Sequence, residues 1–93
     1  MIVEYEGQNI DNGIVRFTAS WCVPCRQYKP IFDKAAQLLD ADFYVIDVEQ
    51  YPEVAQEQGV QSIPSVFKVK NGKWERFDSP PHLAKLRNVV NDW

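Results

Sequence analysis

The distribution of hydrophobic residues predicts two short strands and then a long helix in the first half of the chain. Residues 2–5 and 14–18 have the apolar, β-branched composition of strands, and a polar connection, residues 7–13, separates them. Between residues 24 and 39 the apolar positions are spaced as on one face of a helix: Phe32, Ala35, Ala36 and Leu39. We expect Pro30 to kink this helix, because proline has no N–H and its ring clashes with the preceding turn.

The second half begins with another strand and a short helix. Residues 43–48 form a continuous apolar run typical of a buried strand. Residues 52–58 predict a helix that starts at Pro52 and stops at Gly59, because proline suits the first helical position and glycine the position after the last turn.

A hairpin and a last helix complete the pattern. The runs 65–69 and 74–77 flank Lys70-Asn71-Gly72-Lys73, and Asn-Gly predicts a tight turn because both residues tolerate positive φ. Pro80-Pro81 then interrupts the chain, and a stripe at helical spacing follows: Leu83, Leu86, Val89, Val90 and Trp93. The sequence therefore predicts an α/β fold, a mixed sheet with helices covering its faces.

Length and charge limit the classes of function. Residues 1–93 suffice for a single domain with one hydrophobic core. The net charge of -3 argues against a nucleic-acid-binding surface, and the lysines near the predicted turn are typical of a solvated edge. Glu4 and Glu6 interrupt any apolar stretch before it reaches the length of a signal peptide or a membrane span, so we expect a cytoplasmic protein without a membrane partner.

The chemistry is carried by the only two cysteines, Cys22 and Cys25, which lie where the second strand runs into the long helix. Residues three apart on a first helical turn share a face, so their Cα atoms lie roughly 5.5 Å apart and a disulfide can bridge them. Cys22 at the open end faces unpaired backbone N–H groups and the positive end of the helix dipole, which are recognised ways to lower the pKa of a thiol. We therefore expect Cys22 to be the nucleophile and Cys25 the more buried, resolving thiol.

Two other interpretations of the pair are weaker. A zinc site needs four ligands, and the chain offers no third cysteine and only His82, which we interpret as a surface residue, so no metal is expected. A purely structural disulfide across four residues restricts the unfolded chain little.

The segment from Val15 to Cys25, which contains Trp21-Cys22-Val23-Pro24-Cys25, resembles the active site of thioredoxins. Pro30, the Ile63-Pro64 pair and the 70–73 turn are similar to the family pattern in order and spacing. The resemblance implies a central sheet of about four strands and reduction of protein disulfides by exchange at the two cysteines, without a cofactor. It also implies that a thioredoxin reductase, either of the same cell or of a host cell, reduces the protein again. We expect a monomer, although the sequence by itself leaves the oligomeric state open.

The resemblance further assigns a substrate surface. In thioredoxins the proline corresponding to Pro64 follows a cis peptide bond beside the cysteines, and the backbone of the residue before it pairs with substrate. An apolar platform for extended peptides is then formed by Trp21, Val23, Pro24, Ile63 and Pro64. For Trp21 alone, a buried core aromatic is the competing interpretation.

Three departures from the family pattern stand out. Arg16 occupies the position six residues before Cys22 where thioredoxins usually carry a buried Asp, and the usual lysine partner maps to Val45. Arginine cannot act as a base, but its charge could favour a Cys25 thiolate; alternatively, its guanidinium lies in solvent. Val23 replaces the usual glycine, which affects the redox potential. The amino-terminal region is shortened, as in some viral thioredoxins.

Two alternative functions stay open. A glutaredoxin would use the same nucleophile with glutathione and would need basic groups for the carboxylates of that substrate, a requirement that Arg26 could meet. A binding module would use the same surface to hold a partner protein, with the disulfide chemistry incidental.

Overall fold

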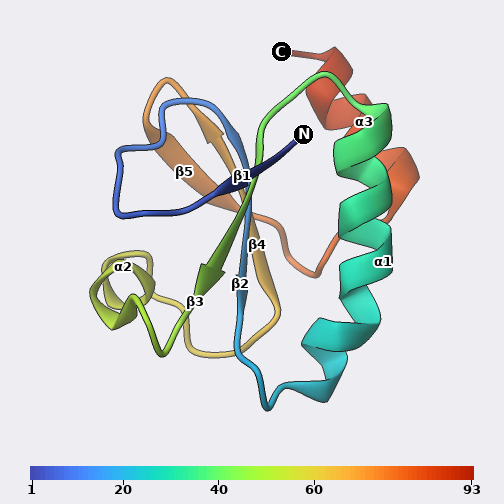
Figure 1. Ribbon diagram of the computed structural model, residues 1–93. Coiled ribbons are helices and arrows are strands. Elements are labelled where there is room, and N and C mark those ends of the chain that lie inside the picture. The colour runs from blue at the N-terminus through green and yellow to red at the C-terminus, as the bar shows by residue number, and fades with distance from the viewer.

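The computed structural model describes residues 1–93 and shows a five-stranded sheet with helices on both faces (Figure 1). In chain order the elements are β1 (Ile2–Glu4), β2 (Gly13–Thr18), α1 (Val23–Leu38), β3 (Phe43–Asp47), α2 (Pro52–Glu57), β4 (Ser65–Lys70), β5 (Lys73–Arg76) and α3 (Leu83–Asn91). Every predicted helix and strand is present, with ends that differ from the sequence-based ranges by one or two residues.

The sheet is mixed, with strand order β1-β3-β2-β4-β5. Strands β1 and β2 both run parallel to β3, whereas β4 is antiparallel to β2, and β5 is antiparallel to β4. The five strands are those that the hydrophobic pattern predicted, one more than the sheet of about four that the resemblance implied, and the short β1 joins the sheet by pairing with β3, Ile2 opposite Phe43. No helix lies between β1 and β2, as the shortened amino-terminal region predicted.

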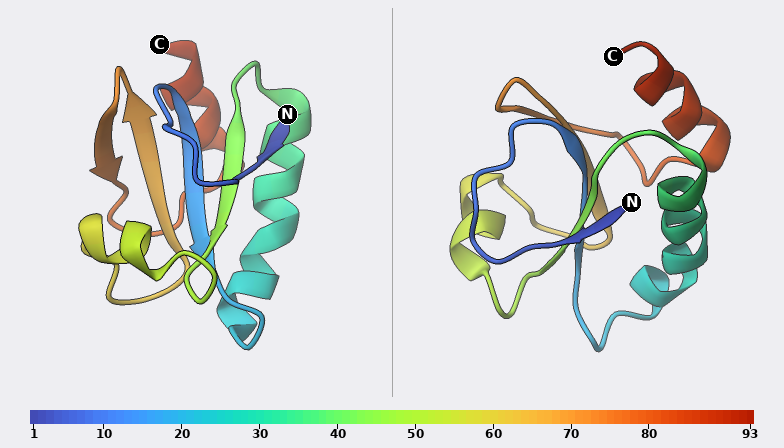
Figure 2. Two further views of the ribbon diagram at one scale, coloured as in Figure 1. Left: turned by 60° about the vertical axis from the view of Figure 1, so that its left-hand side comes forward. Right: turned by 45° about the horizontal axis from the view of Figure 1, so that its top comes forward.

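Alternating side chains of β2 supply both halves of the core. Ile14 faces α1 and α3, in a cluster with Phe32, Phe43 and Leu86. Val15 and Phe17 face the other way, in a cluster that includes Ala55 of α2. Figure 2 shows α1 and α3 together on one face of the sheet and α2 on the other. Because β2 is covered on both faces, the segment that follows it is held by a fully buried strand.

Helix α1 extends from the end of that segment along the length of the sheet. Pro24 lies in its first turn, where a missing N–H costs no helical hydrogen bond. Pro30 lies inside the helix, as the sequence predicted, and leaves the carbonyl group of Arg26 without its helical donor. The helix ends at Leu38, and the N–H of Leu39 still donates to the carbonyl of Ala35 at 2.9 Å.

The predicted hairpin turn joins β4 and β5. Asn71 and Gly72 have φ values of 53° and 78°, and two successive residues with positive φ match the twist of an antiparallel pair. The turn is also attached to the connection before β2, since the N–H of Gly72 donates to the carbonyl of Asp11 at 2.9 Å and that of Asn71 to the side chain of Asn12 at 3.1 Å.

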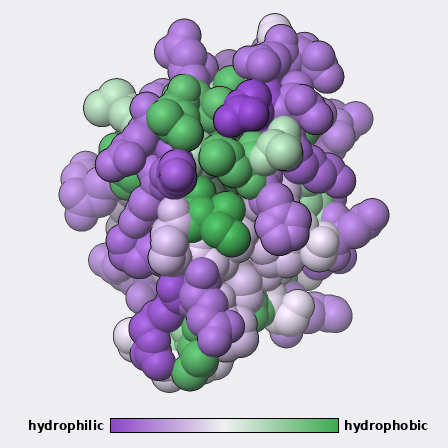
Figure 3. Space-filling view, turned by 90° about the vertical axis from the view of Figure 1, so that its right-hand side faces the viewer, coloured by the Kyte–Doolittle hydropathy of each residue, from purple (hydrophilic) through white to green (hydrophobic).

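Helix α3 packs beside α1. The buried hydroxyl of Tyr28 donates to the carbonyl oxygen of Pro81 at 2.8 Å and so links α1 to the segment that precedes α3. Figure 3 shows the face formed by these two helices, where hydrophobic side chains are visible between hydrophilic ones. No helix is long and apolar enough to cross a membrane.

Candidate active site

Cys22 and Cys25 are joined by a disulfide at the start of α1. Their Cα atoms are 5.3 Å apart, close to the separation expected for two residues on one helical turn. Cys22 is the N-cap of α1, with an extended backbone, and Cys25 lies in the first turn. The strand β2 ends at Thr18, so only three residues separate it from Cys22.

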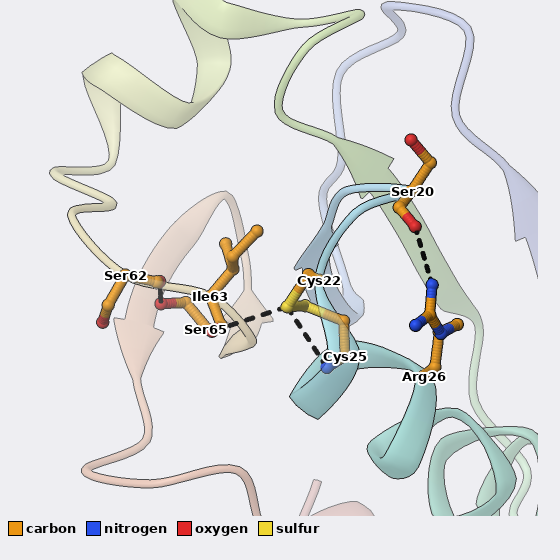
Figure 4. Close-up of a disulfide and its surroundings, with 7 residues drawn as sticks. All are labelled: Ser20, Cys22, Cys25, Arg26, Ser62, Ile63 and Ser65. Carbon is orange, nitrogen blue, oxygen red and sulfur yellow. Dashed lines mark hydrogen bonds between the residues drawn. A yellow bond between two sulfur atoms is a disulfide. The ribbon is translucent and has the colours of Figure 1, made fainter.

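The Cys22 sulfur receives a hydrogen bond from the helix. The backbone N–H of Cys25 donates to it at 3.2 Å, as Figure 4 shows. This N–H is one of the donors that a helix leaves unpaired at its first turn, and such donors stabilise negative charge. The local geometry thus favours the ionised form of Cys22 once the disulfide is reduced.

The same sulfur lies 3.8 Å from the carbonyl oxygen of Ile63. Figure 4 shows Ile63 reaching the disulfide from the loop before β4. The peptide bond between Ile63 and Pro64 is cis, the form that the resemblance implied. Two segments distant in sequence therefore meet at the reactive sulfur.

Both sulfurs are enclosed while the disulfide is closed. Cys22 is 4% exposed and Cys25 1%, and they form a small buried cluster with Ala19, packed against Val48 and Ile63. Sequence reasoning did not single out Ala19 and Val48. The strand pattern could have indicated them, because the carboxyl ends of two neighbouring parallel strands meet at one edge of a sheet. In the structure β2 and β3 are such a pair. At their ends the N–H of Val48 donates to the carbonyl of Thr18 at 2.9 Å.

Apolar side chains around the disulfide are open to solvent. Trp21 is 64% exposed and Val23 is 50% exposed. Pro24 is also exposed, and Ile63 and Pro64 are half-buried. The interpretation of Trp21 as a core aromatic is wrong, because the residue lies on the outside of the connection between β2 and α1.

Arg26 follows the cysteine pair in α1, and its side chain points back to the loop between β2 and α1. Its guanidinium donates to the carbonyl oxygen of Ser20 at 3.1 Å, as Figure 4 shows. His82 is exposed, and no group of three or more His, Cys, Asp or Glu side chains is placed to hold a metal ion.

Arg16 lies in the interior rather than in solvent. Its residue is only 4% exposed, and its guanidinium carbon lies 5.3 Å from the centre of the Phe32 ring. The interpretation that placed its charge in solvent is therefore wrong, because Arg16 faces α1 and the helix covers it. Val45 lies opposite Arg16 on β3, so the two positions where the family usually has an Asp and a Lys are neighbours here.

Burial lowers the pKa of Arg16, and the negative charge of Asp33 partly offsets this effect. The side chain still carries its positive charge near neutral pH. Phe32 follows Cys25 by seven residues, or about two helical turns, so Arg16 contacts α1 roughly 10 Å along the axis from the disulfide.

The family model of thioredoxin matches residues 5–92. The chain belongs to the thioredoxin family. Thioredoxin-1 of Saccharomyces cerevisiae is 41% identical to it over 61 residues, a match that covers 64% of this chain and 59% of that relative. This thioredoxin-family chain thus spans about three-fifths of the length of its yeast relative.

Solved structures agree with the fold. Oxidised mitochondrial thioredoxin 3 of S. cerevisiae superposes with a TM-score of 0.75 at 26% identity, over 89% of this chain and 79% of that one. A thioredoxin mutant from Halobacterium salinarum gives a TM-score of 0.84 at 23% identity, over 99% of this chain and 89% of that one. The thioredoxin fold therefore extends over nearly the whole of the chain.

Proposed function

We propose that this chain is a thiol-disulfide oxidoreductase that reduces disulfides in other proteins. The observation that supports this most directly is the disulfide between Cys22 and Cys25 at the start of α1, in a member of the thioredoxin family. A pair three residues apart, with its outer sulfur bonded to a helix N–H, has the geometry of a reversible redox centre.

The reaction would proceed in two exchanges. In the reduced protein, the Cys22 thiolate attacks one sulfur of the substrate disulfide, forms a mixed disulfide and releases the other substrate sulfur as a thiolate. The Cys25 thiolate then attacks the Cys22 sulfur, closes the disulfide seen in the structure and releases the second substrate sulfur. Two electrons pass from the protein to the substrate, and the protons of the two cysteine thiols balance those taken up by the substrate.

The substrate would lie as an extended segment across the exposed apolar surface next to Cys22. Trp21, Val23 and Pro24 are exposed next to Cys22 in the chain, and Ile63 and Pro64 are half-buried in the loop whose carbonyl reaches its sulfur. The Ile63 carbonyl, 3.8 Å from the sulfur, stands where a backbone N–H of such a segment can donate to it. This arrangement suits a protein disulfide better than a small charged metabolite.

The proposal includes the setting of the reaction. A thioredoxin reductase, of the same cell or of a host cell, would reopen the disulfide, and the cytoplasm would keep the pair mostly reduced. The chain would act as a monomer, and the chemistry needs no cofactor because both exchanges use the protein's own sulfurs. Arg16 would act on Cys25 through its charge alone, without a contact.

Reduction of insulin disulfides by dithiothreitol tests the proposed function. We expect the reduced wild-type protein to accelerate the reaction and Cys22→Ser to lose the acceleration entirely. Exposed Ser20→Ala, two residues away, is the matched control and should retain it. An equal rate with wild type and Cys22→Ser would exclude the proposed activity.

A second experiment distinguishes a thioredoxin from a glutaredoxin. The hydrogen bond from Arg26 to the Ser20 carbonyl occupies one of its N–H donors and holds the side chain back on the loop, so fewer donors are free for the carboxylates of glutathione. We therefore expect thioredoxin reductase to reopen the oxidised protein faster than glutathione does, and the reverse order would favour a glutaredoxin.

A further inference from the structure

A groove away from the disulfide lies between α1 and the strands β1 and β3. Its volume is about 750 Å³, and it is open to solvent. Apolar side chains form its walls: Ile2 and Val45 from the strands, Ala36 from the helix, and Leu39 after it. Figure 1 shows the start of β1 next to the upper part of α1, at the end of the helix remote from the cysteines.

Arg16 forms the base of this groove. Its side chain lines the groove and lies over the Phe32 ring, yet its buried Nε atom has no hydrogen-bond partner. None of the ion pairs in the chain includes Arg16. With only 4% of the residue exposed, water reaches little of this side chain.

The two other charged side chains on the wall neutralise each other. Lys29 and Asp33 form an ion pair one helical turn apart, so the Asp33 carboxylate is held by Lys29 rather than by Arg16. The charges of the three side chains sum to one positive charge, that of Arg16, and Met1, whose terminal ammonium donates to the Ala41 carbonyl, also lines the groove. An N–H group buried without a partner, as at Nε of Arg16, is costly, and an anion in the groove that accepts hydrogen bonds from this guanidinium would recover part of that cost.

The walls indicate the class of anion. An inorganic ion would leave the apolar surface of Ile2, Val45 and Leu39 in water, whereas an aliphatic tail would cover it. The volume falls in the range of small-molecule sites. A carboxylate matches the planar donor edge of a guanidinium with two parallel hydrogen bonds.

We propose that this groove binds a small organic acid, whose carboxylate pairs with Arg16 and whose apolar tail lies against Ile2, Val45 and Leu39. The site uses neither cysteine, so it goes beyond the proposed function and is tested on the oxidised protein without any redox reaction. The Arg16 Nε–H proton is a direct reporter, because it is unpartnered in the free protein.

Titration of the ¹⁵N-labelled, oxidised chain with hexanoate, followed by NMR, tests the proposal. We expect a saturable downfield shift of the Arg16 Nε–H resonance, with further shifts at Gln37 and Val45. Hexan-1-ol, which keeps the tail, and acetate and phosphate, which keep the charge, should each bind at least about tenfold more weakly.

Variants identify the charge that matters. Arg16→Met should weaken hexanoate binding by at least about tenfold, whereas Asp33→Asn, which removes the nearby negative charge, should strengthen it. Lys85→Met is the matched control, because the Lys85 ammonium lies over another ring, 5.8 Å from the centre of Phe77, and outside the groove. It should bind hexanoate as the wild type does.

Several results would overturn the proposal. Absence of a hexanoate shift at Arg16 in the wild type excludes the site without reliance on any variant. Equal binding by Arg16→Met removes the role of the guanidinium. Equal affinity for acetate or phosphate would show that the apolar tail does not contribute to binding. Equal affinity for hexan-1-ol would show that the carboxylate does not.

Discussion

The backbone N–H of Cys25 donates a hydrogen bond to the Cys22 sulfur at 3.2 Å, so the two cysteines have unequal environments although both are buried in the disulfide. After reduction, the donor favours a thiolate at Cys22, whereas Cys25 lies inside the first helical turn. We predict that iodoacetamide at pH 7 alkylates Cys22 at least about tenfold faster than Cys25. Peptide mapping by mass spectrometry measures both rates, with Cys25→Ser assigning the fast one. Equal alkylation rates at Cys22 and Cys25 would contradict this prediction.

Exposed apolar residues next to Cys22 should contribute to substrate binding rather than to stability. Trp21→Ala and Val23→Ser are predicted to raise the KM for insulin by about three- to tenfold, since each removes contact area worth about 1 kcal/mol. The unfolding free energy should change by less than about 0.5 kcal/mol. Leu38→Ala is the control, because Leu38 is similarly exposed, at 58%, at the other end of α1. An equal rise in KM for Leu38→Ala would remove the special role of the surface around Cys22.

Tyr28→Phe should destabilise the fold by about 1–2 kcal/mol, because the Pro81 carbonyl loses its donor. Chemical denaturation at pH 8 measures this loss.

The effect of Tyr28→Phe should also depend on pH. Burial raises the pKa of Tyr28 above its ordinary value of 10.0, against the opposing charge of Arg16. The unfolded chain therefore ionises this hydroxyl first, and its contribution is complete below pH 10 and declines as the pH rises above it. The difference in unfolding free energy between wild type and Tyr28→Phe should be constant up to about pH 10 and shrink above it. A constant difference would show that the hydroxyl ionises equally in both states.

The charge of Arg16 should have a small effect on Cys25. We predict that Arg16→Met moves the pH dependence of Cys25 alkylation, measured in a Cys22→Ser background, upward by less than about one pH unit, because the charge acts across roughly 10 Å. Chemical denaturation of Arg16→Met checks that the fold is intact. The free energy of unfolding should not fall, because the substitution replaces a charge that is buried without an ion pair. An unchanged pH dependence would remove Arg16 from the redox chemistry.

The sequence predicted the order of elements because each carries its own local signal. Helical spacing defines α1 and α3, and Asn71-Gly72 defines the hairpin, since positive φ at two successive residues depends on those residues alone. The cysteine pair was equally predictable, because its spacing and its position at a helix start are both local.

The placement of Arg16 could not be predicted in the same way. Its surroundings come from Phe32 on α1 and Val45 on β3, which approach only after the sheet and helix have packed. The cost of burying a guanidinium favoured an exposed side chain, and the groove that leaves it without partners is itself a product of tertiary structure. The strand at residues 2–5 was predicted, but its pairing with β3 depends on tertiary structure in the same way.

Trapping of the mixed disulfide shows which cysteine attacks the substrate and which resolves the intermediate. Reduced Cys25→Ser and Cys22→Ser proteins are incubated separately with insulin whose disulfides are intact, and covalent adducts are measured by mass spectrometry. We predict that Cys25→Ser accumulates an adduct through Cys22, because no second thiol is present to release the substrate, and that Cys22→Ser accumulates little or none. An adduct that forms through Cys25 as readily as through Cys22, or the absence of any adduct, would contradict this prediction.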